Sequence, residues 1–314
     1  MSQQTAHLAR QTRGPAEAPG KSMWVTATDG LRLHVREYGS RESPGMPVVC
    51  LPGLARSVAD FYQLAPALAF GSPARHVVAI DSRGRGQSDH DADHTNYNCT
   101  VELGDIVGIL IELGVGPAIF IGSSRGGVLT MLLGVAYPSA IAGVVLHDIG
   151  PVAETKGMAR IKSYLGKLPH PRNFEEGAKI LRDLLGTQFP KLTTEQWLAG
   201  AQLTWQMKHG ELKPAYDLGI ARALAGIDVE GPMPAFWNEF DALSNVPMLV
   251  IRGANSDMLS AETVAAMCAR RSKTEAIEVP DQGHAPLLEG ELVRQIVSFV
   301  ENCESARQSA GPAE

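Results

Sequence analysis

The stretch IFIGSSRGGV, residues 119–128, decides the fold of this chain. Its centre, Gly122 to Gly126, fits the pattern G-x-S-x-G, with an apolar strand before it and a helix after it. A turn this sharp strains its apex and needs small neighbours, because larger side chains would collide with the strand and the helix. Ser124 at the apex then lies at a helix N-terminus, where partial positive charge favours a developing oxyanion. The pattern predicts a nucleophilic serine; the alternative is a packing turn rich in glycine and serine.

Buried strands alternate with helices on both sides of this turn. The predicted strands are 47–51, 76–80, 118–121, 141–147, 247–252 and 276–279, and the predicted helices are 60–70, 101–113, 125–137, 261–270 and one within 287–302. Continuous apolar strands with helices between them predict a mostly parallel sheet that is covered on both faces. Asp29-Gly30 separates two short alternating runs, which predicts a hairpin that adds antiparallel strands at one edge.

Composition excludes several classes of protein. Of the 314 residues 44% are hydrophobic, enough for a sizeable core, and the net charge of −6 offers no basic surface for nucleic acid. The cysteines lack a CxxC pair and are Cys50, Cys99, Cys268 and Cys303. This pattern argues against a disulfide framework or a zinc site and favours reduced thiols in a cytoplasmic protein.

The organisation of the chain follows from where the alternation stops. Its length suggests two domains, or one domain with an insertion. Residues 151–243 show helical spacing, proline breaks and no clear strand, so we predict a helical lid there. The other predicted parts are a flexible leader at 1–20, a core formed by 21–150 and 244–303, and a flexible tail at 304–314.

No membrane span is predicted. Residues 1–20 lack the apolar segment of a secretory signal. The uncharged run 126–146 is long enough to cross a bilayer, but Pro138 divides it into a helix and a strand. Both pieces are therefore expected in a protein core.

A nucleophilic serine needs a base, and the base needs an orienting acid. His284 follows the last strand, so it reaches the same sheet edge as Ser124; His147, at the end of its own strand, is the nearest rival. Asp257 follows the strand 247–252 and is the predicted acid, since it lies between serine and histidine in chain order. Asp148 is the alternative acid, or else a loop carboxylate satisfied by backbone amides or by Arg125.

The oxyanion of an acyl transfer needs two N–H donors. One predicted donor is the backbone amide of Arg125, the residue after the nucleophile. The other is the amide of Leu54, in the loop after the strand 47–51, where Gly53 lets the backbone approach closely. An ordinary strand-to-loop turn is the alternative for this second segment.

Five motifs in one order carry a family resemblance. They are LPGL (51–54), DSRGRGQSD (81–89), GSSRGG (122–127), GANSD (253–257) and DQGH (281–284). On these motifs the chain, from about residue 24 to 303, resembles the α/β-hydrolase fold superfamily. It is most similar to bacterial esterases of this fold, some of which accept aliphatic polyesters. The resemblance implies an eight-stranded, mostly parallel sheet flanked by helices, a Ser–His–Asp triad and a helical cap after the strand that follows the serine turn.

One residue departs from the family pattern, and two tryptophans admit two interpretations. The position of Arg125 is often apolar or neutral in the family, and a cation there could pair with Asp148 or lie near the acyl pocket. Trp205 and Trp237 either line an apolar substrate pocket or fill the core of the lid. The segment 89–94 has metal-ligand residue types, but a polar loop rarely brings them together, so neither a metal nor a cofactor is predicted.

These observations predict a serine hydrolase that cleaves carboxylic esters. Ser124 attacks the carbonyl, His284 acts as base and then as acid, and Asp257 orients the imidazole. The expected partner is a small-molecule or polymeric ester, and no feature of the sequence sets the oligomeric state. A carbon–carbon bond hydrolase, a lactonase or a perhydrolase on the same triad is one alternative. A ligand receptor without enzymatic activity is another.

Overall fold

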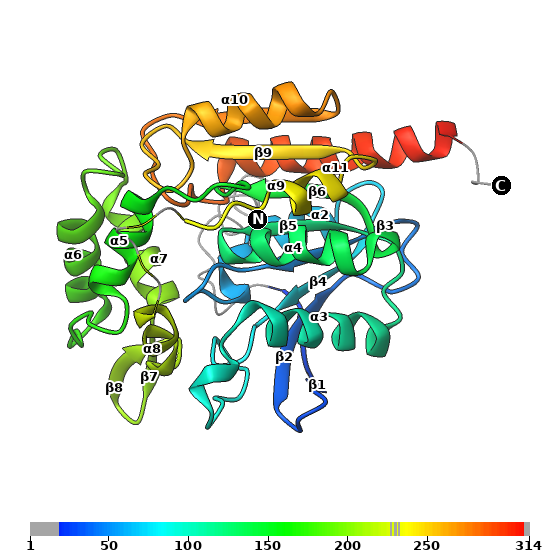
Figure 1. Cartoon of the computed structure of the whole chain (residues 1–314). Coiled ribbons are helices and arrows are strands. Elements are labelled where there is room, and N and C mark those ends of the chain that lie inside the picture. Colours follow the sequence, from blue (N-terminus) through cyan, green and yellow to red (C-terminus); the bar gives the residue numbers. More distant parts are fainter. Residues whose placement is uncertain (1–18, 227, 229–230, 232, 311–314) are drawn as a thin grey trace, which may run out of the picture.

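One eight-stranded sheet forms the middle layer of the molecule (Figure 1). The computed structural model describes residues 19–226, 228, 231 and 233–310, so most of the predicted leader lies outside the described residues. In the sheet the strand order is β1-β2-β4-β3-β5-β6-β9-β10. The strands are β1 (Lys21–Thr26), β2 (Arg32–Tyr38), β3 (Gly45–Leu51), β4 (Arg75–Ile80), β5 (Ala118–Ser123), β6 (Ile141–His147), β9 (Met248–Gly253) and β10 (Thr274–Val279).

The predicted mixed sheet is confirmed. Strands β1 and β2 form an antiparallel hairpin around Asp29-Gly30, and β2 pairs antiparallel with β4. Every other pair in the sheet is parallel. The parallel strands therefore place their carboxyl ends, and the loops that follow them, at one common edge.

Helices cover both faces of this sheet. On one face lie α3 (Cys99–Leu113) and α4 (Arg125–Ala136), and on the other lie α2 (Leu64–Ala69) and α11 (Gly290–Ala310). Alternate residues of each strand contribute to the two cores. In β3, for example, Val49 and Leu51 pack in the core with α3, whereas Val48 and Cys50 pack in the core with α11. Another helix, α10 (Ala261–Arg270), connects β9 to β10.

Most of the segment between β6 and β9 forms a separate layer beyond the strand ends, but its last helix, Trp237–Ala242, packs against α4 (Figure 1). The segment contains α5 (Thr155–Tyr164), α6 (Phe174–Leu185), α7 (Thr194–Thr204), β7 (Trp205–Lys208), β8 (Glu211–Pro214), α8 (Gly219–Ala225) and α9 (Trp237–Ala242). The expectation that this segment has no strand is wrong, because β7 and β8 form a hairpin. At its turn, His209 and Gly210 both have positive φ, as a type I′ turn requires.

The C-terminal helix extends beyond the predicted end of the core. It continues to Ala310, although a tail was expected from residue 304. Glu304 explains the extension, because its carboxylate accepts hydrogen bonds from the Arg75 guanidinium at 3.0 Å and from the Met46 amide at 2.6 Å. The boundary at 304 is therefore wrong, and of the predicted tail only residues 311–314 lie outside the described part of the chain.

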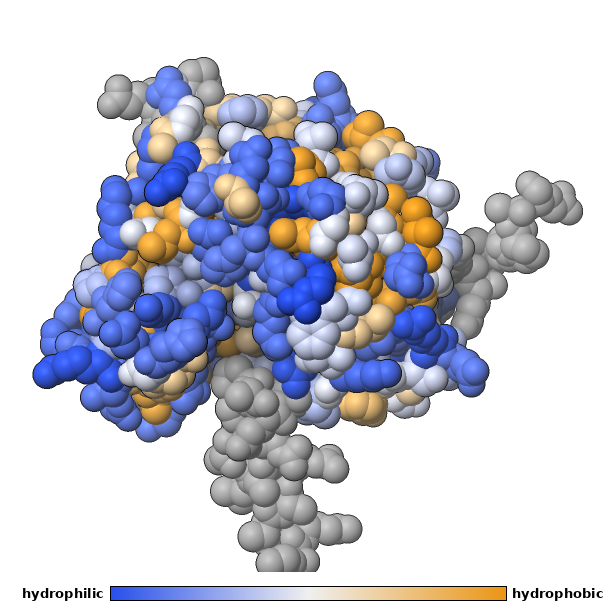
Figure 2. Space-filling view, turned by 90° about the horizontal axis from the view of Figure 1, so that it is seen from below, coloured by the Kyte–Doolittle hydropathy of each residue, from blue (hydrophilic) through white to orange (hydrophobic). Residues whose placement is uncertain are grey.

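The apolar residues of the chain lie partly in groups on the surface and partly in the core. In the view from below, hydrophobic residues form groups separated by hydrophilic ones (Figure 2). The uncharged run 126–146 divides between α4 and β6, whose side chains contribute to the core. Among the described helices, none combines the length and the apolar composition needed to cross a bilayer.

Candidate active site

Ser124 lies at the apex of the turn between β5 and α4. Its backbone has φ 47° and ψ −113°, a conformation that non-glycine residues rarely adopt. The flanking glycines make this turn possible. A Cβ on Gly122 would lie 2.5 Å from the Gly126 carbonyl oxygen, and a Cβ on Gly126 would lie 2.1 Å from the Leu51 carbonyl oxygen. The strand and the helix thus pack too closely for any side chain at these two positions.

A continuous line of hydrogen bonds starts at the serine hydroxyl. His284, in the loop after β10, has its Nε2 atom 2.9 Å from Ser124 Oγ. Its Nδ1 atom lies 2.7 Å from Asp148 Oδ2. The structure therefore brings Ser124, His284 and Asp148 together, from three loops at the carboxyl edge of the sheet.

The carboxylate on His284 is the alternative of the sequence analysis, and the choice of Asp257 is corrected. Asp257 lies in the loop after β9, but it forms a bidentate ion pair with Arg160 of α5, at 2.7 and 2.9 Å. Both aspartates follow strands that end at this edge, and both lie between Ser124 and His284 in chain order. The local sequence does not distinguish them, because the cation that holds Asp257 comes from the inserted segment.

The environments of the two carboxylates differ. Asp148 is fully buried and accepts two further hydrogen bonds, from the Gly253 amide and the Ser256 hydroxyl, each 2.7 Å long. Burial raises the pKa of Asp257, but the hydrogen bonds from Arg160 and Gln188 and the positive charge of Arg160 together outweigh it, and this pKa is lowered from its ordinary value. Asp257 is therefore held as an anion by its partner in α5.

His147, the rival base, has a different partner. Its Nδ1 atom lies 3.0 Å from the hydroxyl oxygen of Ser123. Burial lowers the pKa of His147 to about 4, because an imidazolium ion is poorly solvated there. His147 is thus a neutral, buried side chain, next in sequence to Asp148 but not hydrogen-bonded to Ser124.

The two predicted oxyanion-hole residues flank the serine. Arg125 is the first residue of α4, and Leu54 belongs to the loop after β3. This loop approaches Ser124 closely, since a Cβ built on Gly53 would lie 3.7 Å from the Cβ of Ser124. Use of the Leu54 and Arg125 amides as oxyanion donors stays a prediction.

A buried charge network connects the same two residues. Arg85 donates from Nε to the Leu54 carbonyl at 2.7 Å and from Nη1 to Glu102 at 2.8 Å. The other oxygen of Glu102 accepts from Arg125 Nε at 2.7 Å. The Arg125 side chain thus contacts Glu102 rather than Asp148. Sequence reasoning missed Arg85 and Glu102, although Arg85 belongs to the quoted motif 81–89.

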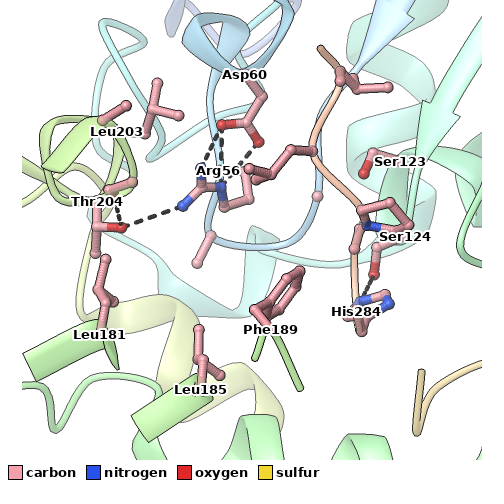
Figure 3. A pocket seen from close by; sticks show the side chains of 18 of the residues that line it. Arg56, Asp60, Ser123, Ser124, Leu181, Leu185, Phe189, Leu203, Thr204 and His284 are labelled. Atoms are coloured by element: carbon pink, nitrogen blue, oxygen red, sulfur yellow. Dashed lines mark hydrogen bonds and ion pairs between the residues drawn. The ribbon is translucent and has the colours of Figure 1, made fainter. Parts of the chain in front are cut away.

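A cavity of about 260 Å³ opens beside the serine and histidine, between the sheet edge and the inserted segment. Its wall is mostly apolar and includes Leu181, Leu185 and Phe189 (Figure 3). Such an enclosed apolar space next to a nucleophile is suited to a small organic substrate.

Trp205 and Trp237, for which a pocket wall and the core of the lid were both open, do not line this cavity, so the pocket interpretation is corrected. Trp205 is buried in the core of the inserted segment, together with Leu212 of the hairpin. Trp237 packs edge-on against Phe240, with ring centroids 5.8 Å apart. It is Trp197, on α7, that contributes to the cavity wall.

The part of the chain that the structure describes holds no group of three or more histidine, cysteine or acidic side chains placed to bind a metal ion. In the segment 89–94, Asp89 pairs with Arg32 and Asp91 pairs with Arg83. These carboxylates are therefore used in ion pairs.

Comparisons with known proteins agree with the fold. The model of the alpha/beta hydrolase family matches residues 48–296, which include the serine turn and the histidine loop. A 3-hydroxybutyrate-oligomer hydrolase of Cupriavidus necator is 33% identical over 267 residues, 81% of this chain and 87% of that protein. A 2-(acetamidomethylene)succinate hydrolase of Mesorhizobium japonicum is 26% identical over 255 residues, 81% of this chain and 85% of that protein. A crystal structure of an alpha/beta hydrolase from Novosphingobium aromaticivorans is 38% identical, with a TM-score of 0.83 over 90% of this chain and 99% of that one.

Proposed function

Because the chain belongs to the alpha/beta hydrolase family, we propose that it hydrolyses carboxylic esters through an acyl-enzyme on Ser124. The observation that carries the proposal is the unbroken line of hydrogen bonds from Ser124 through His284 to Asp148. A serine hydroxyl becomes an effective nucleophile only when a base takes its proton, and the base needs an acid that fixes its tautomer.

In the proposed reaction, Ser124 Oγ attacks the ester carbonyl and His284 Nε2 takes the hydroxyl proton. Asp148 accepts the hydrogen bond of Nδ1–H and stabilises the imidazolium ion. The amides of Leu54 and Arg125 donate to the oxyanion. His284 then gives its proton to the leaving alcohol, a water molecule adds to the acyl group by the same base catalysis, and Ser124 is released.

The cavity suggests the class of ester and a role for the inserted segment. Its apolar wall suits short aliphatic groups, and the 33% identical relative is named for hydrolysis of 3-hydroxybutyrate oligomers. We therefore favour short aliphatic esters, including oligoesters. Helices α5 to α7 supply much of the cavity wall, so residues 151–243 are proposed to cover the site as a lid.

A second candidate keeps the same three residues and changes the bond that is cleaved. The relative named for 2-(acetamidomethylene)succinate hydrolysis favours it, because the name does not describe an ester. Carbon–carbon bond hydrolysis, lactone opening and perhydrolysis belong to this candidate. A panel of esters, lactones, amides and ring-cleavage diketones separates these activities from simple ester hydrolysis.

The test of the proposal is Ser124→Ala, with p-nitrophenyl butyrate as substrate. Without the hydroxyl no acyl-enzyme forms, so kcat falls by about 10⁴- to 10⁶-fold. The matched control is Ser123→Ala, which removes the neighbouring hydroxyl that contacts His147 instead of His284. The control keeps most of the activity, and circular dichroism shows that both variants fold.

A covalent probe makes the outcome specific. A fluorophosphonate labels the wild-type protein and Ser123→Ala, but not Ser124→Ala, and mass spectrometry locates the label. Wild-type activity that survives in Ser124→Ala contradicts the proposal. Labelling of Ser124 without turnover of any substrate in the panel would instead indicate a receptor.

A further inference from the structure

One basic side chain lies in the wall of the otherwise largely apolar cavity. Of the described residues that line it, Arg56 is the only lysine or arginine. In Figure 3 its guanidinium group lies between Asp60 and Thr204, on the side of the cavity away from Ser124 and His284. The side chain is 35% exposed, and it lines the space open to a ligand. A ligand in the cavity can therefore contact the Arg56 side chain.

The guanidinium group of Arg56 does not use all of its N–H donors in contacts within the protein. Nε and Nη2 donate to the Asp60 carboxylate, at distances between 2.6 and 3.1 Å. Nη1 donates to Thr204 Oγ1 at 3.3 Å, a long hydrogen bond. A guanidinium group has five N–H donors, and these contacts occupy three of them. Within the described part of the chain the other two have no hydrogen-bond partner, so a ligand oxygen can accept from them.

The residues around Arg56 indicate which chemical group of a ligand would bind there most strongly. Leu181, Leu185 and Leu203 line the space beside Arg56, so its neighbours there are apolar (Figure 3). Hydrogen bonds from arginine to a carboxylate are about twice as strong as those between neutral groups. Asp60 offsets the charge of Arg56, so a bound carboxylate gains from the two donors rather than from a net charge. The expected effect on binding is therefore moderate.

Arg56 also has a fixed position relative to the ester carbonyl. It is two residues from Leu54, whose amide is a proposed oxyanion donor. The Arg56 amide donates to the Gly53 carbonyl at 3.2 Å, which closes the turn between them. The Asp60 pair holds the side chain at its other end. A substrate with its reactive carbonyl at Leu54 therefore finds the Arg56 donors at a set distance.

We propose that Arg56 binds a free carboxylate carried by the substrate. The inference rests on the proposed ester hydrolysis and names the substrate class: half-esters of dicarboxylic acids, or acylated hydroxy acids. In both, a carboxylate lies a few bonds from the ester that Ser124 attacks. Binding of this carboxylate requires the guanidinium donors of Arg56, whereas cleavage of the ester does not use them.

Two pairs of substrates test the proposal and distinguish the side of the ester that carries the carboxylate. Methyl hydrogen glutarate has the carboxylate on the acyl side, and methyl 5-methylhexanoate replaces it by a branched alkyl group of similar shape. The compound 3-acetoxybutanoate has it on the alcohol side, and 4-methylpentan-2-yl acetate is its apolar counterpart. The measured quantity is the ratio of kcat/KM for the acid to kcat/KM for its counterpart, by titration of released acid.

The variant is Arg56→Met, and the matched control is Lys191→Met. Lys191 is an exposed cation that pairs with Asp281 of the histidine loop and lies outside the cavity wall. In Arg56→Met the ratio falls by about tenfold or more for at least one pair, because two charge-assisted hydrogen bonds are lost. In Lys191→Met it stays within about twofold. A ratio that is unchanged in Arg56→Met, or that falls equally in the control, overturns the proposal.

A second variant covers a failure of Arg56→Met to fold. Arg56→Lys retains the charge but lacks the planar group that can hold Asp60 and a ligand together, so its ratio lies between wild type and Arg56→Met or falls as far. An Arg56→Lys protein with the wild-type ratio overturns the recognition by guanidinium. Failure of ester hydrolysis itself is recognised separately, since the Ser124→Ala comparison with p-nitrophenyl butyrate does not involve a carboxylate.

Discussion

The loops after β6 and β9 end at the same edge of the sheet, and each presents an aspartate. Asp148, after β6, is fully buried and contacts His284 at 2.7 Å. Asp257, after β9, contacts Arg160 of the inserted segment. The difference shows that an aspartate at the end of a neighbouring strand does not, by that position alone, become the acid that orients the histidine. The neighbour that reaches each carboxylate decides its use.

The β9 loop still contributes to the site, through groups other than its aspartate. The Gly253 amide and the Ser256 hydroxyl both donate to Asp148. One loop therefore supplies the carboxylate, and the other supplies donors that hold it in place beside His284. The ion pair of Asp257 with Arg160 links the β9 loop to α5, so its contribution is to the attachment of the inserted segment.

Among changes in these two loops, the largest effect is expected from Asp148→Asn. An amide keeps the shape but cannot stabilise the imidazolium ion, and it favours the wrong histidine tautomer, so kcat falls by about 10³- to 10⁴-fold. The assay is hydrolysis of p-nitrophenyl butyrate, with circular dichroism for the fold. The matched control is Asp281→Asn, which removes a carboxylate from the histidine loop that pairs with Lys191 instead of His284. Equal losses in the two variants would contradict the assignment.

A smaller effect is expected from Ser256→Ala. The change removes one of the donors to Asp148 and leaves the carboxylate in place, so kcat falls by about tenfold, in line with the loss of one charge-assisted hydrogen bond. KM changes little, because Ser256 does not line the cavity. Steady-state kinetics measure both constants. A rise in KM with unchanged kcat would instead mean that the β9 loop acts on substrate binding.

The smallest effect on catalysis is expected from Asp257→Asn. We expect kcat to change by less than about fivefold, since Asp257 is not hydrogen-bonded to His284. Stability falls instead by about 1–3 kcal/mol, because Arg160 keeps its charge in a largely buried place. The stability difference from wild type shrinks as the pH falls below the ordinary aspartate value of 3.8, since the lowered pKa of Asp257 favours folding only while it is ionised.

Thermal unfolding measures this last effect. The melting temperature of Asp257→Asn falls by about 5 °C. The control is Asp241→Asn, which breaks the more exposed Asp241–Arg270 pair and changes the melting temperature by about 2 °C or less. If Asp257→Asn loses as much kcat as Asp148→Asn, both loops supply the acid and the comparison fails.

Much of the fold was predictable because its signals are local. Asp29-Gly30 marks the hairpin β1–β2, and Gly30 adopts the positive φ of the turn. The hairpin β7–β8 was missed because its turn uses His209-Gly210, in which a histidine takes a positive φ that is uncommon for a residue with a side chain. The end of α11 was misplaced because Arg75, far away in sequence, holds Glu304.

In the candidate site, too, features with local signals were predictable and contacts between distant residues were not. Ser124 and His284 were placed at one edge from strand order alone, and they lie within hydrogen-bond distance. The Arg125 side chain was uncertain, and its partner proved to be Glu102 of α3. Trp205 and Trp237 could not be placed, because sequence does not show which face of the inserted segment covers the cavity.

The sequence by itself determined the serine turn, the alternation of strands and helices, and the loop that carries the histidine. These features depend on glycine conformations and on periodicity within a few residues. Only the tertiary structure decided which aspartate contacts His284, which aromatic side chain lines the cavity, and that Arg56 faces it. The partners in those contacts are far apart in the chain: 136 residues separate His284 from Asp148, and 97 separate Asp257 from Arg160. Two aspartates with the same local context thus differ only in what folding brings beside them.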